Sequence, residues 1–272
     1  MNAIDAWAQV ATGRTHQELP EVARLFEKSG SAHLLKQHLN PEQTVALMDQ
    51  GGVDKLMLAA WCRPERWLCT NDEVAEFTRA FPERFVGVAT VDLSKPLAAV
   101  RELERAVTEL GFKALRIVPW LWKLPPNHRL YYPLYVKCIE LDIPFCTQVG
   151  HTGPLMPSET GRPVPYLDEV ALDFPELRIV AGHIGHPWTD EMIGLAWKHD
   201  NIYIDTSAYL PRYYPPQLLH FMSTYGQDKV LFGSNFPQLS LHKCTSQVKE
   251  LALSDEVLAK FLYGNARQVF KL

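Results

Sequence analysis

Short apolar runs alternate with amphipathic stretches of helical spacing along almost the whole chain. The apolar runs lie at 3–9, 53–60, 84–92, 112–120, 143–150, 178–181, 201–208 and 229–235. Helical spacing occurs at 19–29, 41–50, 71–80, 97–110, 133–141, 167–174, from 189 onward, and at 216–225, 242–252 and 255–270. Continuous apolar runs are typical of strands buried on both faces. The pattern therefore predicts a parallel sheet whose strands are joined by helices.

Residues that cap helices support several of these boundaries. Asn40, Asn71, Thr189 and Ser254 stand at predicted helix starts, where a side-chain oxygen can accept a hydrogen bond from a free backbone N–H. Glycines follow several helices, as at 51–52, where a left-handed residue commonly ends a helix. These signals predict helices from Asn40, Asn71, Thr189 and Ser254.

Eight strands alternate with helices at a spacing of about thirty residues, which is typical of consecutive βαβ units. Eight such units in 272 residues predict an α/β fold, a single-domain (β/α)8 TIM barrel spanning 1–272 with an extra C-terminal helix. An open doubly wound sheet is the alternative. It would be favoured by a glycine-rich phosphate loop after the first strand, and no such loop is present there.

Composition limits the partners and the location that we expect. The net charge of -4 gives no electrostatic reason to expect binding to nucleic acid or to an anionic membrane. Five scattered cysteines, no signal-like N-terminus and no apolar run of about 20 residues favour a cytoplasmic protein. We expect a small-molecule substrate as partner, and a homo-oligomer remains open.

Polar and aromatic residues stand where the predicted strands end. In a TIM barrel these ends form the active site. The candidates are Trp7, Gln9, Trp61, Arg116, Trp120, Gln148, His151, His183, His186, Asp205 and Asn235. The long irregular stretch 151–166 is expected to form a lid or a binding loop.

Arg116 and the tryptophans allow two interpretations each. A guanidinium within an apolar strand needs a partner, which is either a substrate carboxylate or a buried acid such as Asp92 or Asp205. The tryptophans form either the core or an aromatic wall for a flat substrate.

Six motifs in the same order resemble the amidohydrolase-related family that includes aminocarboxymuconate-semialdehyde decarboxylase. They are Ile4-Asp5-Ala6, the strand 111–116 with Arg116, the run 177–185 with His183, the stretch 201–207 with Asp205, the stretch 231–237 with Asn235, and the closing Gly-Asn-Ala at 264–266. The resemblance implies the TIM-barrel fold and an enzyme of the metal-dependent hydrolase superfamily.

The family's usual metal ligands are substituted here. The resemblance implies a first-strand His pair, a strand-five His and a strand-eight Asp, which bind a divalent ion, usually zinc. This chain has Trp7 and Gln9 at the pair, Asn235 at the Asp, and either Gln148 or His151 at strand five. Because Trp cannot bind a metal and amides carry no charge, we expect no metal cofactor. Zinc or another divalent metal is expected only if His151, His183 and His186 form an atypical site.

Three functions follow from this set of residues. The first is hydrolysis of a small carboxylated or aromatic lactone, ester or amide, with His183 or His151 as general base and Asn235 polarising the carbonyl. The second is non-oxidative decarboxylation of an aromatic or muconate-like acid. The third is a barrel that binds a ligand without catalysis. In the first two, the remaining candidates, Trp7, Gln9, Trp61, Arg116, Trp120, Gln148, His186 and Asp205, bind substrate.

Overall fold

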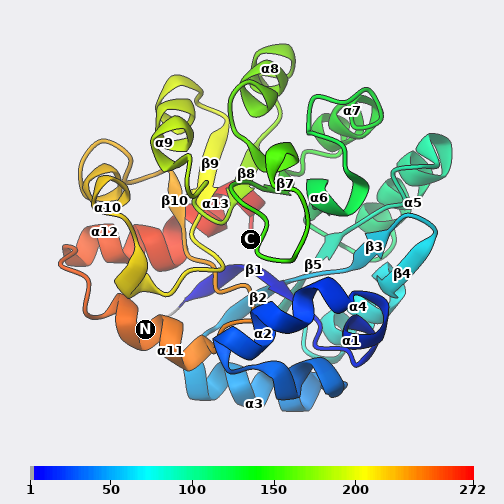
Figure 1. Cartoon of the computed structure of the whole chain (residues 1–272), viewed down its shortest axis with the longest axis horizontal. Helices are drawn as coiled ribbons and strands as arrows, with labels where there is room; N and C mark the ends of the chain where they lie inside the picture. The colour runs from blue at the N-terminus through cyan, green and yellow to red at the C-terminus, as the bar shows by residue number, and fades with distance from the viewer. Residues whose placement is uncertain (1–2) are drawn as a thin grey trace.

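The computed structural model describes residues 3–272, and an eight-stranded parallel sheet forms its centre. The strands are β1 (Ile4–Gln9), β2 (Lys55–Ala59), β5 (Phe85–Ala89), β6 (Ala114–Ile117), β7 (Phe145–Gln148), β8 (Ile179–Gly182), β9 (Ile202–Asp205) and β10 (Val230–Leu231). Each strand pairs with the next of this series, so the strands follow one another around a ring (Figure 1).

The ring closes between its first and last strands through backbone hydrogen bonds. Ala6 N donates to Phe232 O and Gln9 N donates to Phe236 O, both at 2.9 Å, and Asn235 N donates to Trp7 O at 2.9 Å. The predicted single-domain (β/α)8 barrel is therefore confirmed.

Helices surround the barrel, as the alternating pattern predicts. They are α3 (Pro41–Gly51), α4 (Asn71–Ala80), α5 (Pro96–Thr108), α7 (Tyr132–Glu140), α8 (Tyr166–Asp173), α9 (Thr189–Lys198), α10 (Pro216–Ser223) and α11 (Leu241–Val248). No helix within 3–272 is long and apolar enough to cross a bilayer.

The extra C-terminal helix packs under the amino ends of the strands. The segment contains α12 (Asp255–Ala259), a π-helical turn (Lys260–Gly264) and α13 (Asn265–Phe270), so the predicted continuous helix 255–270 is interrupted. Val269 and Phe270 of α13 pack with Ile4, Met57 and Val180 from the strands. The chain end accordingly lies in the middle of the ring in Figure 1.

Two predicted helix caps are confirmed and two are wrong. Asn40 caps α3 in a full capping box and Ser254 caps α12. Thr70 caps α4 instead of Asn71. The Asn71 side chain donates from Nδ2 to Thr90 O and accepts at Oδ1 from Thr90 N.

At α9, Thr189 is the first helical residue and not the cap. Its Oγ1 atom is buried without a hydrogen-bond partner, and the Trp188 side chain before it makes no capping bond. The helix starts one residue earlier than the threonine signal indicates.

Several short elements depart from the sequence prediction. Strand 112–120 ends at Ile117, because Pro119 opens the short helix α6 (Pro119–Trp122). The hairpin of β3 (Trp61–Arg63) and β4 (Arg66–Cys69) was not predicted. The predicted helix 19–29 divides into the 3-10 turn η1 (Pro20–Val22) and α2 (Ala23–Ser29).

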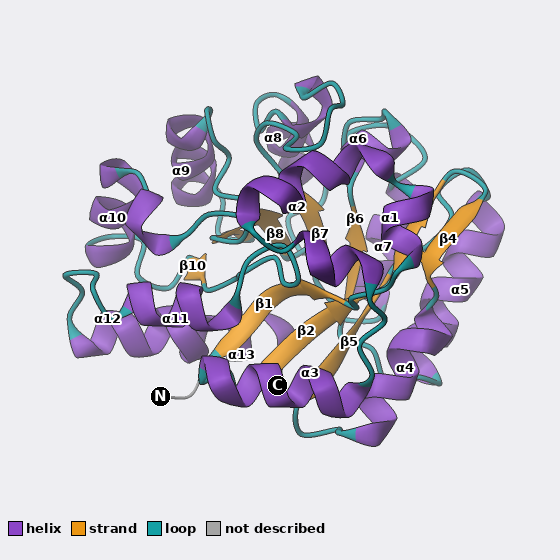
Figure 2. Ribbon diagram, turned by 60° about the horizontal axis from the view of Figure 1, so that its bottom comes forward, coloured by secondary structure: helices purple, strands orange, loops and turns teal. Residues whose placement is uncertain are grey.

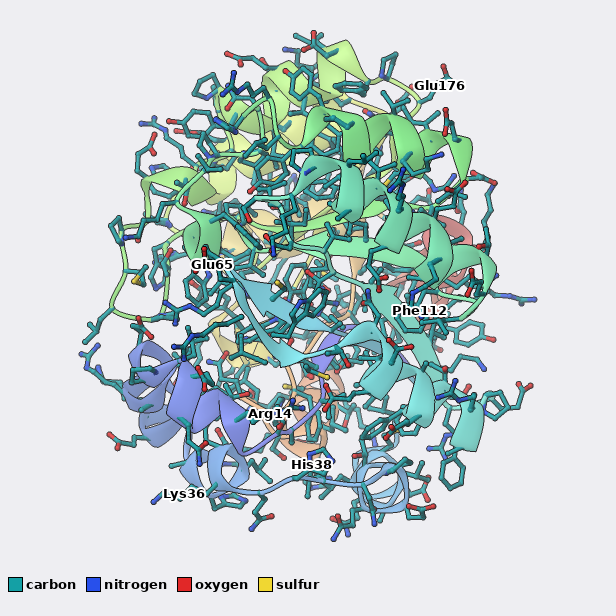
Figure 3. All side chains as sticks on the ribbon, turned by 90° about the vertical axis from the view of Figure 1, so that its right-hand side faces the viewer. Arg14, Lys36, His38, Glu65, Phe112 and Glu176 are labelled. Atoms are coloured by element: carbon teal, nitrogen blue, oxygen red, sulfur yellow. The ribbon has the colours of Figure 1, made fainter. Side chains whose placement is uncertain are left out.

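Residues 10–39 form a cap segment over the carboxyl ends of the strands. It contains α1 (Arg14–Glu18), η1, α2 and the 3-10 turn η2 (Ala32–Lys36). Figure 2 shows α1 and α2 on the side of the sheet opposite α13. In Figure 3, the labelled Arg14, Lys36 and His38 of this region gather at the end of the molecule away from Glu176. The cap segment positions its inward side chains against the strand ends.

Candidate functional site

A cavity of about 270 Å³ lies between the carboxyl ends of the strands and the cap segment. Eight of the predicted site residues line it: Trp7, Gln9, Trp61, Trp120, Gln148, His151, His183 and Asn235. The cap segment adds apolar side chains, including Leu25 and Phe26. Among the described lining residues there is no Lys, Arg, Asp or Glu. The cavity is therefore suited to a small, flat and largely apolar compound.

The wall of the cavity is strained where three strands end. His183 after β8, Ala208 after β9 and Asn235 after β10 all line it and have positive φ angles of 74°, 66° and 67°. A non-glycine residue in this conformation costs roughly 1–3 kcal/mol and persists only where its surroundings enforce it. Such residues concentrate at functional sites, which agrees with the position of the cavity.

The imidazole ring of His183 contacts Ser207 and Trp7. Its Nδ1 lies 2.7 Å from Ser207 Oγ, and its ring centre lies 5.1 Å from that of Trp7. Burial, followed by the charge of Arg116, lowers the pKa of His183 to about 3. The imidazole is therefore neutral near pH 7. Since Nδ1 is engaged, Nε2 is the ring nitrogen that can meet a ligand.

Trp7 needs space that a glycine provides. A Cβ atom at Gly182 would lie 2.5 Å from the Trp7 ring, so the last residue of β8 must lack a side chain. The indole can then lie between His183 and the guanidinium of Arg116, whose Cζ is 4.0 Å from the ring centre. Trp7 thus lines the cavity beside His183.

Asp205, the last residue of β9, is fully buried behind His183 and does not line the cavity. Its Oδ1 accepts a hydrogen bond from Ser207 N at 2.9 Å and a second, short contact joins it to Ser207 Oγ. Its Oδ2 has no partner among the described atoms. Burial raises the pKa of Asp205 to about 7. The sequence predicted Asp205 as a substrate contact, whereas the structure places it behind Ser207 and His183, of which only His183 lines the cavity.

Arg116 is also inside the barrel and not on the cavity wall. Its Nη1 donates to Ala8 O at 3.0 Å and its Nη2 donates to Ala6 O at 3.2 Å. Burial lowers the pKa of the guanidinium to about 10. The predicted contact with a substrate carboxylate does not fit this position, and no ion pair joins Arg116 to Asp92 or Asp205 among the described side chains. The partners of the guanidinium are these two backbone carbonyls of β1 and, at 3.5 Å from Nη1, the side-chain Oε1 of Gln9.

Three side-chain amides form a hydrogen-bonded series along one wall. Gln9 Nε2 donates to Asn235 Oδ1 at 2.9 Å, and Asn235 Nδ2 donates to Gln238 Oε1 at 2.5 Å. Gln238 also lines the cavity and was not predicted, although it follows Asn235 by only three residues. These amides are neutral hydrogen-bonding groups beside the cavity.

Of the two candidates for the strand-five position, Gln148 is the last residue of β7 and His151 lies three residues beyond it. Gln148 ends β7, and its Nε2 donates to the backbone carbonyls of Val149 and Gly150, both at 3.1 Å. Its Oε1 is buried and has no partner among the described atoms.

His151 and His186 lie farther out along the rim. His151 is exposed, and its Nδ1 lies 3.3 Å from both His186 O and Tyr209 Oη. His186 is exposed and does not line the cavity. Its ring stands edge-on to that of His151, with centres 5.6 Å apart. His183 is therefore the enclosed imidazole of the predicted three.

Two further aromatic side chains line the cavity. Trp61 of β3 and Trp120 of α6 meet edge to face with ring centres 6.4 Å apart. Tyr209, which follows the β9 motif, completes the aromatic lining and was not predicted. The sequence signal that could have found it is its place four residues after Asp205.

The residues at the family's metal positions do not fit a divalent ion. Gln9 and Asn235 bond each other directly, Trp7 carries no ligand atom that suits zinc, and Gln148 turns its Nε2 to the backbone. Within 3–272, no three His, Cys, Asp or Glu side chains are placed to hold a metal ion. The atypical site from His151, His183 and His186 does not fit either, because His186 lies outside the cavity that the other two line.

Comparison with known proteins now identifies the family. The amidohydrolase family model matches residues 4–272. The chain belongs to the amidohydrolase family. Among curated amidohydrolase relatives, a gamma-resorcylate decarboxylase of Polaromonas sp. JS666 is 24% identical over 85% of this chain and 87% of its own. A 2-keto-4-carboxy-3-hexenedioate hydratase of Sphingobium sp. SYK-6 is 28% identical over 74% of this chain and 70% of its own.

A solved amidohydrolase structure shows the same fold. The dihydroxybenzoic acid decarboxylase of Polaromonas sp. JS666 has a TM-score of 0.74 and 22% identity, and covers 100% of this chain and 98% of that one. It was crystallised with bound manganese and the inhibitor 2-nitroresorcinol. At this identity the likeness concerns the fold, whereas the metal-binding chemistry depends on ligands that this chain lacks.

Proposed function

We propose that this amidohydrolase-family enzyme is a lyase of small aromatic or unsaturated acids, acting as a non-oxidative decarboxylase with His183 as the proton donor. The observation that carries the proposal is the position of His183. Its ring is fixed between Trp7 and Ser207, and its Nε2 is left for a ligand in the cavity. A side chain held in this way can deliver a proton to one defined atom.

The activities of the relatives favour a lyase over a hydrolase. One curated relative is a decarboxylase and another is a hydratase. Decarboxylation and hydration both require a proton to move to or from a carbon atom. A hydrolase needs an activated water and a polarised carbonyl instead.

In the proposed reaction, the ring of the acid lies flat against the aromatic wall. His183 Nε2–H donates its proton to the ring carbon that bears the carboxylate, while Nδ1 takes up a proton from Ser207 Oγ, which is replaced from Asp205, so that the imidazole stays neutral. The bond between that carbon and the carboxylate carbon breaks, its electron pair forms the new C–H bond, and CO2 leaves. The amides of Gln9 and Asn235 are placed to hydrogen-bond ring hydroxyls.

The test is incubation with 2,6-dihydroxybenzoate and related hydroxybenzoates in deuterium oxide. The proposal expects release of CO2 and one deuterium at the carbon that lost it. His183→Asn should remove this activity, while the rim variant His186→Asn should keep most of it. Release of CO2 at equal rates in wild type and His183→Asn would overturn the role of His183.

Hydrolysis is the second candidate, and the amide series favours it. Gln9, Asn235 and Gln238 provide neutral donors of the kind that polarise a lactone or ester carbonyl. Incorporation of oxygen-18 from water into an acid product, without CO2, would support this candidate over the lyase.

A further inference from the structure

A continuous chain of contacts connects the cavity to a buried acid inside the barrel. His183 Nδ1 lies 2.7 Å from Ser207 Oγ, and Ser207 Oγ in turn makes a short contact with Asp205 Oδ1. Ser207 and Asp205 are both completely buried, and neither lines the cavity. A hydroxyl has one hydrogen to donate, so Ser207 can donate to only one of these two neighbours at a time.

We propose that Ser207 and Asp205 are positioning residues that determine which ring nitrogen of His183 carries the proton. When Asp205 is ionised, Ser207 donates to Oδ1, and His183 must donate from Nδ1–H to Ser207 Oγ. Nε2 is then bare and acts as an acceptor. When Asp205 is protonated, it donates to Ser207 Oγ, Ser207 donates to Nδ1, and Nε2 carries the hydrogen. The switch between the two tautomers does not depend on the proposed function, and only its role in catalysis rests on that function.

The surroundings of Asp205 favour a proton on Oδ1. Oδ2 has no hydrogen-bond partner among the described atoms, and it faces Gly233, whose added Cβ would lie 2.2 Å away. A hydrogen on Oδ2 would therefore be buried without an acceptor, which costs about 1–3 kcal/mol. On Oδ1 the hydrogen meets Ser207 Oγ.

The same contacts provide the proton for the proposed reaction without an imidazolium. As His183 Nε2–H gives its hydrogen to the ring carbon, Nδ1 takes the hydrogen of Ser207, and Ser207 Oγ takes that of Asp205 Oδ1. The N–H and two O–H bonds that break are replaced by C–H, N–H and O–H bonds. The negative charge of the substrate carboxylate ends on Asp205, and His183 stays neutral throughout.

Charged and titratable groups from several elements face the two ends of the chain of contacts. Asp205 faces Asp5 of β1, Arg116 of β6, Cys146 of β7 and Tyr214 after η4 (Pro211–Tyr213), while His183 faces Arg116 and His151. Burial dominates at both ends: it raises the pKa of Asp205 to about 7 and lowers that of His183 to about 3. Above about pH 3 His183 is therefore neutral, and Asp205 changes its charge near pH 7.

Nitrogen-15 NMR of histidine-labelled protein tests the inference without any substrate. Long-range proton–nitrogen correlation distinguishes an N–H from a bare nitrogen, and His183→Asn identifies the His183 signals. We expect wild type to carry the hydrogen on Nε2 at about pH 5 and on Nδ1 at about pH 8.5. Asp205→Asn should keep it on Nδ1 at both, because Ser207 N–H holds the amide oxygen at the Oδ1 position.

Ser207→Ala should abolish the pH dependence, and Ser234→Ala is its matched control. Ser234 is another buried serine, and it bonds Asp5 but makes no bond to His183. In Ser234→Ala the His183 tautomer should change with pH as it does in wild type. Thermal melts of all variants should be measured to check that they fold. A single His183 tautomer in wild type across this pH range would overturn the inference, as would a normal switch in Ser207→Ala.

The activity measurements separate this inference from the proposed function. If decarboxylation occurs, its rate should fall as the pH rises through the pKa of Asp205, and Asp205→Asn should lose at least about tenfold near pH 6. If the tautomer switch is observed but no lyase activity is found, the proposed function fails and the positioning role stands. If CO2 is released while the tautomer is fixed, the positioning role fails.

Discussion

Replacing Arg116 with methionine tests whether this buried cation supports the barrel. Its guanidinium donates to Ala8 O at 3.0 Å and to Ala6 O at 3.2 Å, and it lies 4.0 Å from the Trp7 ring. Each hydrogen bond from a charged donor contributes about 1.5–3 kcal/mol, and a desolvated cation–π contact about 2 kcal/mol. Relief of the desolvation of the guanidinium offsets part of this sum. We expect Arg116→Met to lower the free energy of unfolding by about 3 kcal/mol.

The assay is urea unfolding followed by circular dichroism and tryptophan fluorescence at neutral pH. Arg162→Met is a matched control, because Arg162 pairs with Glu191 at 3.1 Å near the surface, where such pairs contribute about 0–1 kcal/mol. If Arg116→Met unfolds within about 0.5 kcal/mol of wild type but raises KM severalfold, the guanidinium contacts the ligand. The placement of Arg116 described above would then be wrong.

Three further predictions concern the cavity and the groups behind it. His183→Asn should lower turnover by about 10²–10⁴-fold with an unchanged melting temperature, while His186→Asn loses little; steady-state kinetics measure both. The pKa of Asp205 is raised to about 7, so its stabilising contribution is complete below about pH 4 and is lost as the pH rises through 7. Urea titrations should show wild type losing on the order of 2–4 kcal/mol relative to Asp205→Asn between about pH 4 and pH 8; equal pH dependence in both would contradict this. Gly182→Ala should displace Trp7, whose ring lies 2.5 Å from the added Cβ, and so reduce turnover and alter tryptophan fluorescence while the barrel still folds.

The barrel was predictable because its signal repeats eight times. Each short apolar run and the helix after it give only a weak indication, but their regular spacing excludes most other folds. Short elements were missed because they give no repeated signal. The hairpin from Trp61 to Cys69 and the helix α6 are too brief to show periodicity. Asn71 was predicted as the cap in place of Thr70 because both residue types can cap a helix. Only the structure shows that the Asn71 side chain hydrogen-bonds the backbone of Thr90 instead.

The sequence could predict only those site residues that lie at the carboxyl ends of the strands, because a barrel brings these ends together. Trp7, Gln9, Gln148, His183 and Asn235 meet around one cavity because parallel strands end on the same rim. The sequence cannot tell which residues of a strand buried on both faces point into the barrel.

For that reason Arg116 and Asp205 were expected at the ligand, although they lie behind it. Ser207 and the residues of the cap segment were missed because their roles depend on contacts between distant parts of the chain.

We propose that proton transfer by His183 does not use the divalent metal of the family. The most direct measurement is turnover of one preparation before and after exhaustive chelation, with its metal content determined by elemental analysis. We expect less than about 0.2 equivalents of zinc or manganese, because Trp7, Gln9 and Asn235 replace three expected ligands. Turnover should be unchanged by chelation and by added manganese. Loss of turnover on chelation, with recovery when manganese is restored, would contradict the claim.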